Sequence, residues 1–255
     1  MKRTQLLKRT IAVLMFAVLP LGAFAASGGY PLDEMVPDMT DKASLQRGAK
    51  TYMNYCYGCH ATGFQRYERV ADDLGIPHDL MMENLMPAGG KIGDLMTNGM
   101  DPKESKNWFG ATPPDLTLVA RVRGTDWLYT YLRTFYLDPK RPYGVNNKVF
   151  PDVGMPHVLL ELQGAQVDTC GGGASQLDTL TGEKLCGLEP DSSIKGSMTP
   201  GQFDQAMYDL VNFLSYSGEP MQLERQRLGI YVLLFLLVFF VVAYLLKREY
   251  WKDVH

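Results

Sequence analysis

Hydrophobic residues recur at helical spacing in three segments of the chain. After Asp41, steps of four and three residues mark one stripe of a helix, formed by Leu45, Ala49, Tyr52, Cys56 and Cys59. This stripe predicts a helix that delivers both cysteines onto one face. A second helix is predicted from Thr125, which can cap it, to about Leu137, with three inward residues: Leu128, Leu132 and Phe135.

The third helical segment has the clearest start signal. Thr199 is a capping residue, Pro200 suits the first helical position, and Gln202 completes a capping box. Its inward stripe is expected to end at Gly218 and consists of Phe203, Met207, Leu210 and Leu214. Gly- and Pro-rich stretches at 86–94 and 137–147 predict loops, and strand signals are few and short. We therefore predict a mainly α domain with long irregular loops.

The start of the chain is apolar and has the pattern of a signal peptide. Basic residues precede an apolar run from Ile11 to about Leu21, and Ala23-Phe24-Ala25 fits a small-x-small cleavage site. We predict a signal peptide over residues 1–25, cut after Ala25 or the next alanine. The alternative is an uncleaved anchor helix, which is disfavoured because the run is short and contains a proline.

The apolar run near the other end, 228–246, carries no charge. At about 1.5 Å per residue it spans about 28 Å, close to the hydrocarbon thickness of a bilayer at about 30 Å. It is therefore predicted to be a transmembrane anchor. Flanking lysines and arginines differ too little in number to orient it. The signal peptide orients it instead, with residues 27–226 as an exported domain and 247–255 as a cytoplasmic tail.

Length and charge narrow the class of protein. A chain of 255 residues suffices for one domain of ordinary size plus the two terminal segments. The formal net charge is -3 and no basic run is present, so nucleic-acid binding is not indicated. No internal repeat or long linker divides the exported part.

The residues that carry chemistry are concentrated in Cys56-Tyr57-Gly58-Cys59-His60, a C-x-x-C-H pattern typical of c-type haem attachment. Two thiols three residues apart can bond to the two vinyl groups of one porphyrin, and His60 then becomes the proximal iron ligand. A redox dithiol and half of a zinc site are the alternatives, but the sequence lacks a βαβ pattern and a second closely spaced ligand pair. The single motif predicts one covalent haem c in a cytochrome c-type domain.

The sixth iron ligand must come from a distant part of the sequence. Met155 fits best, because Gly154 permits close backbone approach and Pro151 and Pro156 restrict the chain on both sides. His157, two residues further on, is the main rival. Two more histidines are candidates by residue type alone, although the second lies beyond the predicted anchor: His78 and His255.

Several stretches together resemble cytochrome c1 of bacterial type, the haem subunit of the cytochrome bc1 complex (ubiquinol–cytochrome c reductase). They are SLQRGAKTYMNYCYGCH, PPDLTLVARVRGTDWLYTYL, VFPDVGMPHVL and the C-terminal anchor. The resemblance extends from about Leu45 to the end of the chain, in the family's order. C-x-x-C-H is shared by many families, whereas the P-P-D-L and G-M-P segments with a single anchor are specific.

This resemblance implies roles for particular residues. Met155 would be the axial methionine, Pro113 and Pro114 would line the haem pocket, and Arg123 would pair with a haem propionate. Arg121 is the alternative for the propionate, and a solvated charge at the start of a helix is the alternative for an arginine here.

The function that the resemblance implies is one-electron transfer in the respiratory chain. The donor would be the Rieske iron–sulfur protein, the acceptor a transiently bound cytochrome c, and cytochrome b a further subunit of a dimeric membrane complex. The haem domain would lie in the periplasm at the bacterial inner membrane, with no catalysis by the chain alone. Alternatives are an anchored cytochrome of a terminal oxidase or shuttle, and a haem sensor or peroxidase.

Two cysteines remain outside the haem motif, Cys170 and Cys186. They flank a Gly-rich loop in a chain predicted to be exported, and an even remainder in an oxidising compartment favours a disulfide. Two free thiols are the alternative. This loop departs from the core of the family that the chain resembles.

Overall fold

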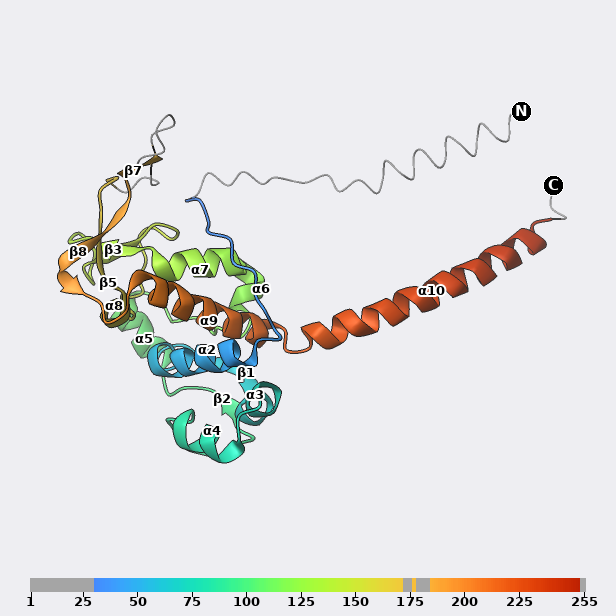
Figure 1. Ribbon diagram of the computed structural model, residues 1–255. Helices are drawn as coiled ribbons and strands as arrows, with labels where there is room; N and C mark the ends of the chain where they lie inside the picture. Colours follow the sequence, from blue (N-terminus) through green and yellow to red (C-terminus); the bar gives the residue numbers. More distant parts are fainter. Residues whose placement is uncertain (1–29, 172–175, 178–183, 253–255) are drawn as a thin grey trace.

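The computed structural model of the chain describes residues 30–171, 176–177 and 184–252. The predicted signal peptide, 1–25, lies outside the described residues, as does His255. Within the described part, helices predominate, so the predicted mainly α class is confirmed. Figure 1 shows a domain built around neighbouring helices, with one long helix extending away from it.

Among the described residues, the long helices are α2 (Lys42–Tyr55), α9 (Pro200–Gly218) and α10 (Gln222–Tyr250). Shorter helices fill the segments between them. They are α3 (Tyr67–Leu74), α4 (His78–Asn84), α5 (Pro102–Phe109), α6 (Val119–Arg123), α7 (Thr125–Arg133) and α8 (Leu160–Gln163).

The strands are short and pair antiparallel in twos. The pairs are β1 (Thr62–Arg66) with β2 (Leu95–Met96), β3 (Phe135–Leu137) with β4 (Val145–Asn147), β5 (Gly164–Asp168) with β8 (Leu188–Lys195), and β6 (Gln176–Leu177) with β7 (Lys184–Cys186). The predicted loop 86–94 is irregular as expected. The predicted loop 137–147 is instead the connection of a hairpin, because its ends lie in β3 and β4.

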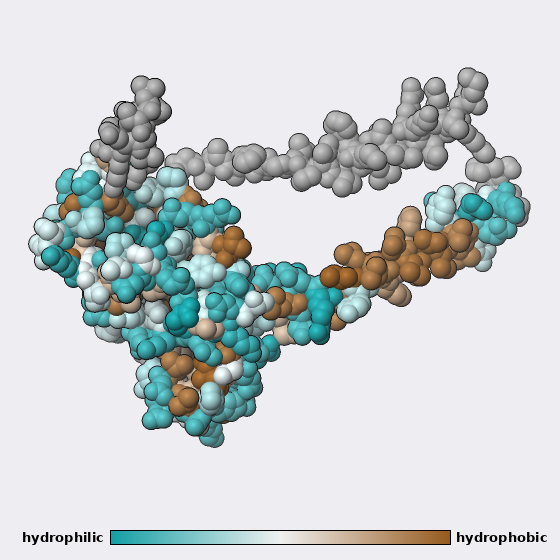
Figure 2. Space-filling model, in the orientation of Figure 1, coloured by the Kyte–Doolittle hydropathy of each residue, from teal (hydrophilic) through white to brown (hydrophobic). Residues whose placement is uncertain are grey.

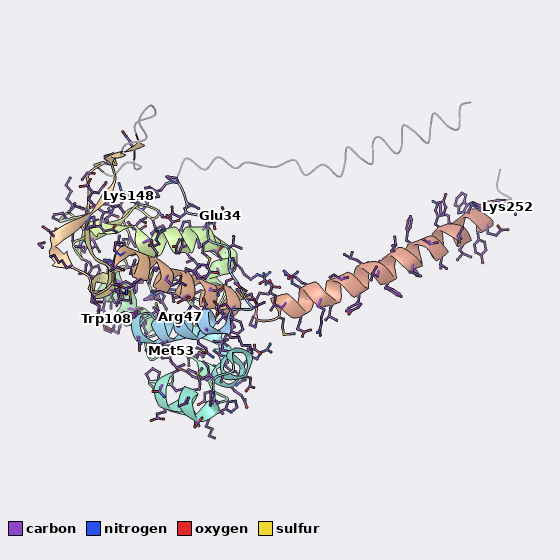
Figure 3. The ribbon with its side chains drawn as sticks, in the orientation of Figure 1. Glu34, Arg47, Met53, Trp108, Lys148 and Lys252 are labelled. Atoms are coloured by element: carbon purple, nitrogen blue, oxygen red, sulfur yellow. A yellow bond between two sulfur atoms is a disulfide. The ribbon has the colours of Figure 1, made fainter. Side chains whose placement is uncertain are left out.

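Helices α2 and α9 lie side by side in the core with their backbones in close contact (Figure 1). A Cβ atom on Gly48 of α2 would lie 2.0 Å from the backbone oxygen of Asp209 and 2.7 Å from the Cβ of Phe213. Only glycine permits this approach. Beside it Arg47, labelled in Figure 3, donates hydrogen bonds of 2.6 and 3.0 Å to the buried carboxylate of Asp209. Close backbone contact and an ion pair therefore both hold α2 against α9.

The helix predicted after Asp41 is present, but it ends at Tyr55, before both cysteines. Asp41 caps α2 as the sequence indicates. At the other end, the Tyr52 carbonyl accepts hydrogen bonds from the N–H groups of both Cys56 and Tyr57, at 2.9 Å each. The second bond, from Tyr57 five residues further on, widens the last turn, ends the helix and changes the direction of the chain. The expectation that one helical face presents both cysteines is therefore wrong, since Cys59 lies in the following turn.

The helix predicted from Thr125 to about Leu137 is shorter than expected. It ends at Arg133, because residues 135–137 pair with β4 as strand β3. Thr125 does not cap it either. Gly124 precedes the first turn, and the Thr125 hydroxyl donates to the Met35 carbonyl at 2.8 Å. The predicted inward residues are nevertheless buried: Leu128, Leu132 and Phe135.

Helix α9 confirms its sequence signals. The side chain of Thr199 accepts from Gln202 N–H and that of Gln202 accepts from Thr199 N–H, so both halves of the capping box form. Gly218 is the last helical residue. The predicted stripe is buried throughout: Phe203, Met207, Leu210 and Leu214.

Helix α10 contains the whole predicted span 228–246, and its side chains are exposed and apolar (Figure 2). Among the described residues it is the one helix long and apolar enough to cross a membrane. A soluble helix would bury such a surface. We therefore assign α10 as a single-pass membrane anchor.

Cys170 and Cys186 meet in the structure. Their sulfur atoms are joined as a disulfide with a Cα–Cα distance of 5.1 Å. The Cys170 N–H donates to the Asp168 carboxylate at 2.9 Å. That carboxylate forms a 2.6 Å ion pair with Lys148, and the side chains are only 5% and 1% exposed (Lys148 is labelled in Figure 3). The segment that carries the cysteines is thereby tied to the chain after β4.

The disulfide can be tested directly. Mass spectrometry of a non-reduced digest should show one peptide pair joined through Cys170 and Cys186. Replacing both by serine should destabilise the domain by about 3 kcal/mol, because the bridge closes a loop of roughly fifteen residues. Two alkylated free cysteines in the untreated protein would contradict the pairing.

The helix crossing predicts a strong effect at one glycine. Gly48→Ala should lower the free energy of unfolding by about 3 kcal/mol or more, because the obstructing atom belongs to rigid backbone. Thermal unfolding of the detergent-solubilised protein measures this. Gly201→Ala is the matched control, since no heavy atom outside its neighbours lies within 4 Å of a Cβ there. Equal midpoints for the two variants would show that the crossing is not constrained.

Candidate haem site

A cavity of about 330 Å³ opens in the domain. It lies within the size range of small-molecule and cofactor sites, about 300 to 1,000 Å³. Its wall is mainly aliphatic and aromatic, with contributions from α6, α7, α9 and the loops around them. All seven residues that the sequence assigned to cofactor binding line it: Cys56, Cys59, His60, Pro113, Pro114, Arg123 and Met155.

The C-x-x-C-H segment forms a turn at the end of α2. The Cys56 carbonyl accepts from the N–H of Cys59 at 3.1 Å and from that of His60 at 2.8 Å. The buried Tyr52 hydroxyl donates to the His60 carbonyl at 2.6 Å. These bonds hold the two thiols and the imidazole against the same cavity wall.

The imidazole of His60 is oriented for iron ligation. Its Nδ1 lies 2.8 Å from the Pro114 carbonyl oxygen. A carbonyl can only accept, so Nδ1 carries the proton and Nε2 keeps its lone pair. Burial lowers the pKa of His60, which favours this neutral form. Metal-ligating histidines are commonly oriented in this way through their other nitrogen.

The segment that contains Pro113 and Pro114 is fastened to the chain after His60. The Leu116 N–H donates to the Ala61 carbonyl at 2.8 Å, and the Asp115 carboxylate accepts from Gly63 N–H at 2.7 Å. The P-P-D-L stretch therefore lies beside the haem motif, although about fifty residues of chain separate them. Two of the segments on which the family resemblance rests are therefore in direct contact.

The two alternatives for the cysteine motif are not supported. Burial, and to a smaller extent the neighbouring Cys59, raises the pKa of Cys56 to about 12. A redox dithiol needs a lowered thiol pKa instead. Among the described residues no group of three or more His, Cys, Asp or Glu side chains could hold a metal ion, which leaves a zinc half-site without its second half.

Met155 lies on a loop held by buried side chains of β4. The Asn147 side-chain oxygen accepts from backbone N–H groups of Val149 and Phe150, at 2.9 and 3.1 Å, and that of Asn146 accepts from Asp152 N–H at 2.8 Å. A Cβ on the neighbouring glycine, Gly154, would lie 3.1 Å from the Phe109 carbonyl. The rigidity expected from glycine and proline is thus reinforced by side-chain hydrogen bonds.

The rival sixth ligands do not line the cavity. His157 stacks on Phe135 with ring centroids 4.8 Å apart, and burial lowers its pKa to about 4. His78 pairs with Asp72 at 2.7 Å at the start of α4. The cavity geometry favours Met155 over both.

Arg123 and Arg121 are separated by the fold. The Arg123 guanidinium lies at the cavity, 5.0 Å from the ring centroid of Trp127 and 6.0 Å from that of Phe150. The stem of Arg121 lies against Gly218 at the end of α9. Arg123 is therefore the arginine in position to meet an anionic group of a bound cofactor.

Trp127 and Tyr131 are among the residues of the cavity wall that sequence reasoning missed. They lie one turn apart on α7, with rings stacked at 4.9 Å and 10°. The Tyr131 hydroxyl donates to Met155 Sδ at 3.3 Å. Their spacing of four residues, beside the inward stripe of the same helix, was the available signal.

Two thiols, an imidazole and a thioether around one apolar cavity, with an arginine at its edge, define a c-type haem-binding domain. The chain belongs to the cytochrome c1 family, whose model (Cytochrome C1 family) matches residues 33–178 and 195–254. Membership implies a covalent haem c and a place in a cytochrome bc1 complex. The unmatched residues, 179–194, include Cys186, in agreement with the departure expected for that loop.

Relatives match the chain over nearly its full length. Cytochrome c1 of Allochromatium vinosum is 49% identical over 98% of this chain and 100% of its own. A protein of Nitrosomonas europaea named ammonia monooxygenase gamma subunit is 45% identical over 97% of this chain and 100% of its own. Cytochrome c1 of Rhodobacter capsulatus is 25% identical over 96% of both chains.

The ligand assignment predicts the behaviour of one methionine variant. Met155→Leu should retain covalent haem but lower the reduction potential by more than about 60 mV, a tenfold change for one electron. It should also let carbon monoxide bind the reduced protein. Redox titration and the reduced spectrum with carbon monoxide measure these effects.

Met198→Leu and Met221→Leu are the controls, because neither residue lines the cavity. Both should keep the potential and the spectrum of the unaltered protein. An unchanged potential in Met155→Leu would contradict the assignment.

Proposed function

We propose that this chain carries one covalent haem c and passes single electrons from a Rieske iron–sulfur protein to a cytochrome c, within a ubiquinol–cytochrome c reductase. The observation that carries this proposal is the convergence of Cys56, Cys59, His60 and Met155 on one cavity. Family membership and the apolar helix α10 support it.

Each of these residues has a proposed task. Cys56 and Cys59 would hold the porphyrin through thioether bonds, while His60 Nε2 and Met155 Sδ would bind the haem iron. The haem iron, when bound, supplies a one-electron couple. A methionine opposite a histidine favours a raised reduction potential, which suits a late member of an electron-transfer chain. The apolar wall keeps water from the centre.

Two protein ligands also argue against the alternative of a haem sensor or peroxidase. Such proteins need an open or displaceable axial position for oxygen or peroxide. Here Met155 lies on a loop fastened by Asn146 and Asn147, so it is held rather than free to leave. Outer-sphere electron transfer is the chemistry that remains.

Arg123 and the prolines complete the proposed cofactor contacts. Arg123 would pair with a propionate, because its guanidinium reaches the cavity and has no ion pair among the described residues. Pro113 packs against the cofactor, and Pro114 both packs there and orients His60 through its carbonyl.

The proposed location is the bacterial inner membrane, with residues 27–226 in the periplasm, 228–246 across the bilayer and 247–255 inside. The signal-peptide pattern and helix α10 support this arrangement. The proposed complex is dimeric and includes cytochrome b. Co-purification with cytochrome b and a Rieske protein would distinguish it from a terminal-oxidase cytochrome or an independent shuttle.

Geometry favours an iron–sulfur donor over quinol itself. The cavity belongs to the domain outside the bilayer, whereas quinol stays within the bilayer. The span 228–246 contains no acidic residue or histidine to take the two protons that quinol releases. The predicted span therefore lacks groups to take these protons, which favours a donor that delivers electrons alone.

The purified full-length protein should accordingly be reduced slowly or undetectably by a quinol analogue. Adding the cytochrome b and Rieske subunits should make reduction fast, and a blocker of the quinol-oxidation site should abolish it. Stopped-flow absorbance of the reduced haem band measures the rate. Rapid reduction of the isolated subunit that ignores the blocker would overturn the proposal.

A further inference from the structure

Tyr131 is part of the cavity wall and lies beside Met155, the proposed iron ligand. Its ring lines the cavity, and its hydroxyl donates a hydrogen bond to Met155 Sδ at 3.3 Å. Among the described residues this is the hydroxyl's one hydrogen bond. The contact joins α7 directly to the loop that carries the sulfur.

Packing alone does not account for a hydroxyl at this place. A buried hydroxyl costs free energy unless it is hydrogen-bonded, and a thioether sulfur is a weak acceptor. Phenylalanine would fill the same space without needing a partner. A tyrosine here therefore stabilises the fold less than phenylalanine would, which points to an effect of its hydroxyl on the sulfur.

The neighbours of Tyr131 fix the direction of its hydroxyl. Trp127 stacks on one face of the ring, and Phe135 contacts it edge-on with centroids 5.2 Å apart at 68°. The Tyr131 carbonyl accepts from the side-chain amide of Asn147 at 2.7 Å. Since Asn147 also holds the backbone of the Met155 loop, one buried side chain sets both partners of the hydroxyl–sulfur contact.

We propose that Tyr131 is a positioning residue that raises the reduction potential of the haem through its hydrogen bond to Met155 Sδ. The inference rests on the proposed function, because it takes Met155 as the axial ligand. A thioether sulfur has two lone pairs, of which one can bond iron while the other accepts the hydroxyl proton. The hydrogen bond withdraws electron density from the sulfur, which weakens it as a donor to oxidised iron and favours the reduced state.

Tyr131→Phe tests this, because it removes the hydroxyl and keeps the ring that Trp127 and Phe135 contact. In redox titration of the full-length haem protein in detergent, its ratio of reduced to oxidised protein at a fixed ambient potential should fall about threefold to tenfold. A tenfold fall corresponds to 59 mV for one electron. The weak absorption from methionine–iron charge transfer should shift as well. Tyr131→Leu, a second variant without the hydroxyl, should lower the potential in the same direction.

Tyr129→Phe is the matched control. Tyr129 lies on the same helix but does not line the cavity, and its ring faces Arg133, whose guanidinium carbon is 4.4 Å from the ring centroid. Its loss of a hydroxyl should leave the potential unchanged. A similar fall in this control would overturn the inference.

Two further results would overturn it in distinguishable ways. Unchanged potentials in both Tyr131 variants, with methionine–iron absorption present, would assign Tyr131 to packing only and leave the proposed function standing. A lowered thermal midpoint without a change in potential belongs to the same outcome. Absence of methionine–iron absorption in the unaltered protein would remove both the ligand assignment and this inference.

Discussion

The close crossing of α2 and α9 at Gly48 sets the geometry of the haem-site walls. The backbones touch there, and the Arg47–Asp209 pair fixes how far each helix can slide along the other. The C-x-x-C-H turn begins where α2 ends, and Leu210 and Leu214 of α9 form part of the cavity wall. The helix crossing therefore sets the distance between the cysteine turn and the opposite wall, and any change in it would deform the cavity.

Around this crossing, three irregular segments are held by polar groups rather than by regular secondary structure. The proline segment is bonded to the chain after His60, and the methionine loop is held by the amides of Asn146 and Asn147. The buried Lys148–Asp168 ion pair then connects this region to the segment closed by the Cys170–Cys186 disulfide. Buried charges and amides are costly unless paired, so each of these contacts favours one arrangement of the loops. The site thus gains rigidity although much of its wall lacks helices.

Two further polar contacts lie at the proposed haem ligands themselves. His60 Nδ1 donates a hydrogen bond to the Pro114 carbonyl, and Met155 Sδ accepts one from the Tyr131 hydroxyl. The first contact lies on the ring nitrogen opposite the proposed iron ligand, and the second lies on the proposed ligand atom itself. At such atoms small electrostatic changes alter the preference of an iron centre for one oxidation state. The anchor α10 contributes to location and not to this chemistry, because none of its residues lines the cavity.

The haem motif, the capping box of α9, the apolar anchor and the mainly α class could all be predicted from the sequence, because each depends on residues close together in the chain. All seven assigned cofactor residues meet at the cavity. Met155 is favoured by its local sequence and then by family resemblance, whereas Pro113, Pro114 and Arg123 are reached through resemblance alone. Tertiary structure decided where α2 and α7 end, since an additional bond to Tyr52 and the pairing of β3 with β4 override helical periodicity. It also places Arg123 and not Arg121 at the cavity, and Tyr131 against Met155, because contacts between distant segments position a side chain and local pattern does not.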